Sequence, residues 1–121
     1  MKIIAYILTL MLVSCVHPVV TQEQGLSQND VLHTIKTNLH EIKKCYELEL
    51  KSNPSLKGKV SVRFIVDTDG STESVEVNES SIKSQRMQSC IVSKISSWNF
   101  SRPRNNSKVT VNYPFSFSPP R

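Results

Sequence analysis

The chain has 121 residues and a formal net charge of +5, which leaves room for one domain with a modest core. Its 15 Lys and Arg residues are spread along the sequence without a long basic run. We therefore interpret the charge as a solvated basic surface and expect no nucleic-acid partner.

The N-terminal residues predict export from the cytoplasm. Lys2 precedes an uncharged, mostly apolar run over residues 3–16, which is too short for a comfortable membrane span and is typical of a signal-peptide core. The run ends in Leu12-Val13-Ser14-Cys15, which resembles the lipobox of bacterial lipoproteins. The alternatives are a simple signal peptide with a chance cysteine, and an uncleaved anchor extended by Val19 and Val20.

The lipobox resemblance implies a lipid anchor at Cys15. Residues 1–14 would be the signal peptide, the chain would be cut before Cys15, and residues 15–25 would form a short tether. Several acyl chains on one residue make such anchoring stable. Val16 stands where an Asp would signal inner-membrane retention, so we expect the outer membrane, with the periplasm or the inner membrane as alternatives.

Two further cysteines, Cys45 and Cys90, remain for the exported part of the chain. Paired cysteines oxidise in exported proteins, so we expect one disulfide between them. Two helices and a sheet are predicted below, and each cysteine lies on the flank of the apolar stripe of one helix. Two helices that cover the same face of the sheet would meet at these flanks.

The first element that we predict is an amphipathic helix. Ser27 is placed as its N-cap, with Asp30 in the capping-box position and Leu26 as a hydrophobic staple. Asn53-Pro54 ends the helical pattern. The apolar stripe consists of Val31, Ile35, Leu39, Ile42 and Tyr46. His33 and His40 lie on this helix without a second ligand pair, so we expect solvated histidines and no metal site.

A β-hairpin is predicted next, over residues 57–77. Its first strand has Val60, Val62, Phe64 and Val66 at every second position, and its second strand carries Val75 and Val77. The turn is Asp67-Thr68-Asp69-Gly70, where glycine adopts positive φ without strain. The two aspartates lack the further ligands of a calcium loop, so we assign them to the turn.

After the hairpin we expect a second helix capped by Ser80-Ser81, a loop over residues 99–108 and a third strand over 109–117. The apolar stripe of this helix is Met87, Ile91, Ile95 and Trp98. The third strand alternates apolar Val109, Val111, Tyr113, Phe115 and Phe117 with other residues. Pro114 interrupts that strand, which favours an edge position.

These elements predict an α+β fold: a single small α-β-β-α-β domain over residues 26–118. We expect a three-stranded antiparallel sheet with the first strand in the centre and the third strand beside it. Both helices should pack on one face of the sheet, because each strand has one apolar side.

Several short motifs resemble a TonB-like C-terminal domain, and the most similar form is the AgmX/PglI-type domain of gliding-motility envelope proteins. The resemblance covers residues 26–117. Its motifs are Cys45-Tyr46-Glu47, Asn53-Pro54-x-Leu56-x-Gly58-Lys59-Val60, Gly70, Glu79-Ser80-Ser81-Ile82, Cys90-Ile91, Trp98-x-Phe100 and Tyr113-Pro114-Phe115-x-Phe117.

This resemblance implies a periplasmic binding module without catalytic residues or cofactors. TonB itself spans the inner membrane, crosses the periplasm on a Pro-rich linker and pairs its last strand with a peptide of an outer-membrane receptor. This sequence has neither a secure transmembrane helix nor that linker. Only the binding module is therefore carried over.

We expect an envelope protein of unknown identity to pair with the third strand, and we keep a homodimer through the same edge open. The predicted partner-binding residues are Val109, Thr110, Val111, Asn112 and Tyr113. The alternative is a structural lipoprotein that stabilises an envelope assembly through the outer face of residues 36–47. An enzyme is disfavoured because Glu73 and Glu76 have no obvious His or second acid beside them.

Overall fold

The computed structural model describes residues 25–120. The proposed signal peptide, the lipid anchor at Cys15 and all of the tether except Gly25 lie outside the described residues. The elements follow in the order α1 (Gln28–Leu50), β1 (Gly58–Val66), β2 (Thr72–Ser80), α2 (Gln85–Ser96), a short 3₁₀ helix (Arg104–Asn106) and β3 (Val109–Phe117). This order confirms the predicted α-β-β-α-β succession.

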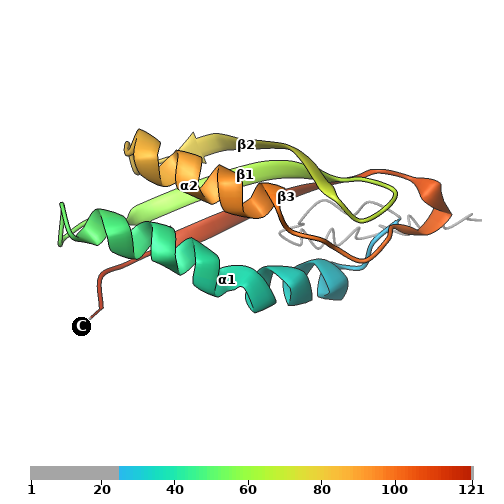
Figure 1. The fold of residues 1–121 in the computed structure, drawn as a ribbon, viewed down its shortest axis with the longest axis horizontal. Helices are drawn as coiled ribbons and strands as arrows, with labels where there is room; N and C mark the ends of the chain where they lie inside the picture. The colour runs from blue at the N-terminus through green and yellow to red at the C-terminus, as the bar shows by residue number, and fades with distance from the viewer. Residues whose placement is uncertain (1–24, 121) are drawn as a thin grey trace, which may run out of the picture.

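The three strands form one antiparallel sheet in the order β2-β1-β3 (Figure 1). The first strand is therefore central and the third lies beside it, as predicted. Alternation along β1 decides which face is covered, because Val60, Val62, Phe64 and Val66 are all fully buried while Lys59 and Arg63 are exposed. Both helices pack over the buried face, and the predicted fold class is confirmed.

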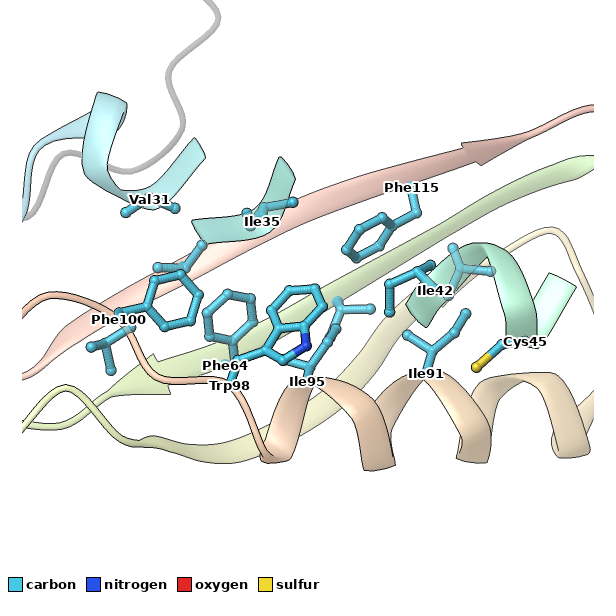
Figure 2. Close-up of a cluster of buried hydrophobic side chains, with 14 of the residues drawn as sticks. Val31, Ile35, Ile42, Cys45, Phe64, Ile91, Ile95, Trp98, Phe100 and Phe115 are labelled. Carbon is cyan, nitrogen blue, oxygen red and sulfur yellow. The ribbon is translucent and has the colours of Figure 1, made fainter. Parts of the chain in front are cut away.

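Apolar side chains from both helices and all of β1 meet between the helices and the sheet. Figure 2 shows Phe64 of β1 beside Trp98 and Phe100, with Ile91 and Ile95 of α2 next to them. The rings of Phe64 and Phe100 are stacked with their centroids 5.4 Å apart. Trp98 also donates its indole N–H to Glu41 of α1 at 2.8 Å, so its one polar atom is satisfied at the edge of the core.

The first helix begins where the sequence predicts. The Ser27 hydroxyl accepts a hydrogen bond from the Asp30 N–H at 3.1 Å, which satisfies one of the free donors of the first turn. Val31, Ile35 and Ile42 of the predicted stripe are buried, whereas Leu39 is only partly covered. The helix ends at Leu50, before Asn53-Pro54.

The predicted start of the second helix is wrong. Its N-cap is Ser84, whose hydroxyl accepts from the Met87 N–H at 3.0 Å, and not the Ser80-Ser81 pair. Ser80 is the last residue of β2, and Ser81 accepts from the Lys59 N–H at 2.9 Å. These two hydroxyls therefore fix the end of the strand. The helix also ends at Ser96, so Trp98 is buried just beyond it.

Gly70 closes the hairpin against the loop that follows α2. It has a φ of +90°, which L-residues rarely adopt, and its N–H donates to the Asp67 carbonyl at 2.8 Å. Its own carbonyl accepts from the Phe100 N–H at 2.8 Å. A Cβ at this position would overlap the Phe100 carbonyl oxygen, so the turn and the loop approach each other only with glycine here.

A disulfide joins the two helices, as predicted from the pair of cysteines. Cys45 of α1 and Cys90 of α2 have their Cα atoms 5.8 Å apart and are separated by 45 residues. Glu49, one helical turn after Cys45, accepts a hydrogen bond from Arg86 at 2.8 Å. The helices are thus held together by a covalent bond and an ion pair on the same side of α1.

Reduction of the disulfide should lower the free energy of unfolding by about 4 kcal/mol, because the open chain gains the entropy of a loop of this length. Urea unfolding of the protein with and without a thiol reductant would measure the change. The Cys45→Ala/Cys90→Ala variant is the control and should not respond to the reductant. Two reactive thiols in the exported wild-type protein would contradict the prediction.

Candidate protein-binding edge

The predicted partner-binding residues Val109–Tyr113 form the first half of β3, at one edge of the sheet. The side chains of Val109 and Val111 are buried in the core, and those of Thr110 and Asn112 lie on the opposite, open face. The structure therefore does not gather these side chains into one cluster. What they share is their place on an outer strand of the sheet, which has β1 on one side only.

The pairing of β3 with β1 is regular from end to end. Each residue has one partner, from Val66 opposite Val109 to Gly58 opposite Phe117, without a bulge. In such a ladder, pairs that exchange two N–H···O bonds alternate with pairs that exchange none. The direction of every backbone group along β3 therefore follows once one pair has been assigned.

Pro114 supplies that assignment. It lies opposite Ser61 and has no N–H, so we assign this pair to the kind that exchanges no hydrogen bonds. By alternation, Thr110, Asn112 and Ser116 direct their N–H and C=O groups away from the sheet. In residues 25–120 these outward groups have no backbone partner in another element. The edge thus offers three free N–H donors, with a gap at Pro114.

The opposite edge of the sheet is irregular. The register of β2 shifts twice against β1, between Ser61 and Val62 and between Arg63 and Ile65. Asn78 lies at one of these bulges, and Ser74, near the other, has a φ of +54°. Bulges interrupt the row of outward groups and twist the strand, so they protect an edge against pairing. Of the two edges, β3 is the better template for another strand.

The open face of the sheet is polar and carries ion pairs. Glu76 forms an ion pair with Arg63, and Glu73 accepts from Lys108 at 2.7 Å. The Glu73 carboxylate raises the pKa of Lys108. Both glutamates that were weighed as catalytic candidates are therefore engaged with basic side chains. These exposed pairs contribute little to stability, and they leave a solvated surface.

The aspartates of the hairpin turn bind the turn itself. The Asp67 carboxylate accepts from the Thr68 N–H at 2.7 Å, and the Asp69 carboxylate accepts from the N–H of Ser71 at 2.9 Å and from its hydroxyl at 2.6 Å. Their assignment to the turn is thus confirmed. Within residues 25–120 no group of three or more His, Cys, Asp or Glu side chains is placed to hold a metal ion.

Ser71→Ala should raise the pKa of Asp69 toward its ordinary value. The side-chain and backbone hydrogen bonds from Ser71 hold that pKa low, and the variant removes the first of them. A lowered pKa means that the contribution of Asp69 to stability is present above the ordinary carboxyl pKa and is lost as the pH falls through the folded-state value. Carboxyl NMR titration would measure the shift.

Ser89→Ala is the control for this titration. Ser89 is exposed on α2, remote from the turn, so its loss should leave the titration of Asp69 unchanged. An unchanged pKa of Asp69 in Ser71→Ala would show that the hydroxyl does not stabilise the turn carboxylate.

Comparison with known proteins decides the family. Residues 53–119 match the family described as the Gram-negative bacterial TonB protein C-terminal. The chain belongs to the TonB C-terminal domain family. Domains of this family are protein-interaction modules of the periplasm-facing cell envelope and not enzymes. The resemblance seen in the sequence is thereby confirmed for the TonB C-terminal family, and the finer likeness to the AgmX/PglI type stays a prediction.

Two solved TonB C-terminal domains resemble the fold. The solution NMR structure of the Pseudomonas aeruginosa TonB domain is 20% identical, with a TM-score of 0.45 over 58% of this chain and 73% of that one. The NMR structure of the Helicobacter pylori TonB domain is 17% identical, with a TM-score of 0.47 over 82% of this chain and 99% of that one. A search among curated proteins found no match.

Proposed function

We propose that this chain is a non-enzymatic binding module of the cell envelope that engages a protein partner by adding its strand to the free edge of β3. The observation that carries the proposal is the regular β3 ladder, whose Thr110, Asn112 and Ser116 present free backbone groups. An extended peptide satisfies such groups by forming a fourth strand. Membership in a family of protein-interaction domains supports the same function.

The side chains beside the edge would recognise the partner from both faces of the extended sheet. Thr110 and Asn112 flank the new strand on the open face, where Asn112 also accepts a hydrogen bond from Asn78 at 3.3 Å. Tyr113 and Phe117 flank it on the helix side, because they share the orientation of the buried Val111. The backbone bonds would supply affinity, and these side chains would supply specificity.

Asn112→Pro should abolish partner capture, because it removes the central outward N–H while the apolar stripe of β3 stays intact. Crosslinking and pull-down from the native envelope would measure capture after circular dichroism has shown that the variant is folded. Asn112→Ala is the matched control. It loses the same side-chain contact with Asn78 but retains the N–H, so it should capture the partner as the wild type does.

The same experiment separates strand addition from the alternative functions. If folded Asn112→Pro captures the same partners as the wild type, edge pairing is not the binding mode. A structural role through α1 instead predicts that Lys36→Glu/Lys44→Glu, on the exposed face of that helix, abolishes capture. A homodimer through two β3 edges predicts that Asn112→Pro converts a dimer to a monomer in light scattering.

We further propose that the domain, over residues 26–118, is carried by a lipoprotein anchor. Residues 1–14 would be the signal peptide, Cys15 the lipidated residue, and residues 15–25 a tether that reaches at most about 40 Å. The Cys45–Cys90 disulfide suits the oxidising compartment that this anchor requires. Gly25, which receives a hydrogen bond from Arg104, lies against Val109, so the tether would enter beside the start of β3.

The place of the domain in the envelope follows from this anchor and from the resemblance to the AgmX/PglI type. The outer membrane, with the domain facing the periplasm, is the proposed location, because Val16 is not an inner-membrane retention signal. Among residues 25–120, no helix is long and apolar enough to span a membrane. A role in a transport or motility complex would suit an anchored binding module.

Cys15→Ser should abolish labelling with radioactive palmitate and release the protein from the membrane fraction, since the thiol is the proposed site of lipidation. Val16→Asp should keep the label and move the protein to the inner-membrane fraction. Both variants leave residues 25–120 unchanged, so circular dichroism should match that of the wild type. Labelling that persists unchanged in Cys15→Ser would contradict the anchor.

A further inference from the structure

A pocket of about 390 Å³ lies between the last turns of α1 and the end of β3. Tyr46 and Leu50 line it from the helix, and Phe117 lines it from the strand, with the Tyr46 and Phe117 ring centroids 5.0 Å apart. The Tyr46 hydroxyl donates to the Leu56 carbonyl, so the ring presents its apolar surface to the pocket. We call this the α1–β3 pocket.

The rim of the α1–β3 pocket carries charges of opposite sign. Lys43 and Glu47 line it one helical turn apart, so their charges offset each other at the mouth. An acidic or a basic ligand would therefore gain little there, whereas an apolar group would lose water against Tyr46, Leu50 and Phe117. The volume leaves room for a large side chain.

The pocket is continuous with the free edge of β3. Ser116 lines the pocket, and its N–H is the last of the outward donors. Phe117 faces the helix side of the sheet. In a strand added to this edge, the residue opposite Phe117 would have its Cβ about 5 Å from that of Phe117 and on the same face. That side chain would enter the α1–β3 pocket.

We propose that the α1–β3 pocket binds one large aliphatic or aromatic side chain of the partner strand, from the residue that pairs opposite Phe117. The inference rests on the proposed pairing with β3 and specifies what that strand must contain. Three backbone donors with a gap at Pro114 hold any extended peptide in the same way. The pocket adds a requirement for sequence and fixes the register of the added strand.

Among residues 25–120, the hollow beside the other edge of the sheet is more polar. The hollow beside β2 is lined by Val77 and Val92 but otherwise by the polar Gln85, Gln88, Ser89 and Ser93. It also flanks a strand with two bulges. At β3 an apolar pocket and a regular row of backbone donors occur together.

Selection of short random peptides displayed on phage, with the purified full-length protein as bait, tests the inference without knowledge of the partner. Selected peptides should share one large aliphatic or aromatic residue at a constant position. Replacement of that residue by Ala should weaken the Kd about tenfold to a hundredfold, because its burial in the pocket is lost. Isothermal titration calorimetry with the synthetic peptides would measure the Kd.

Leu50→Glu should weaken the binding of these peptides by a similar factor, because it places a charge against the apolar side chain of the peptide. Leu48→Glu is the matched control: it makes the same substitution on the same helix, but Leu48 is 58% exposed and does not line the pocket. Ser118→Trp serves as a second variant, since Ser118 is an exposed residue at the pocket and its replacement obstructs the space without changing the core.

The outcomes distinguish this inference from the proposed function. Some peptides could require the Asn112 N–H but bind Leu50→Glu and Ser118→Trp with the wild-type Kd. That result would contradict the binding of a side chain in the α1–β3 pocket, and strand addition would remain supported. Peptides that bind Asn112→Pro as well as the wild type would overturn strand addition, and the inference with it. A constant charged residue in place of the apolar one would also overturn the assignment of the pocket.

Discussion

The described part of the fold depends on the buried face of β1. Val60, Val62, Phe64 and Val66 are fully covered there, and a strand with one apolar side must place every covering element on that side. Both helices therefore lie over the same face, and the other face stays polar, with the Arg63–Glu76 and Lys108–Glu73 pairs on it. In a sheet that is covered in this way, the backbone of each edge strand decides whether another strand can pair with it.

A domain of this size has a small core, and the connection between its helices compensates for that. The Cys45–Cys90 disulfide and the Glu49–Arg86 ion pair hold α1 beside α2. Tyr46 follows Cys45 directly and contacts Phe117, so the element that stabilises the fold also shapes the pocket that we propose for the partner.

The two edges differ in a way that matters for function. Two bulges disrupt the outward groups of β2, whereas β3 pairs with β1 without interruption and is marked only by Pro114. A proline on an exposed strand usually serves to discourage pairing. Here it removes one donor and leaves three, so an added strand would still have backbone partners at Thr110, Asn112 and Ser116. Because the N–H at Pro114 is missing, the backbone makes fewer hydrogen bonds to the partner, and side chains contribute more to the choice of partner.

The sequence by itself determined the element order, the start of α1 at Ser27 and the edge position of β3, because capping residues, alternation and proline act through local backbone chemistry. It misplaced the start of α2, since the Ser81 hydroxyl accepts from the Lys59 N–H, which is distant in sequence, and the Ser80 hydroxyl accepts from the Ile82 N–H at the end of β2. The outward direction of the Ser116 N–H could have been predicted from the sequence, because Ser116 is two residues after Pro114 and backbone directions alternate along a strand. Only the tertiary structure decided that β2 is bulged and that Tyr46, Leu50 and Phe117 enclose a pocket, because both features depend on pairing and packing between distant segments.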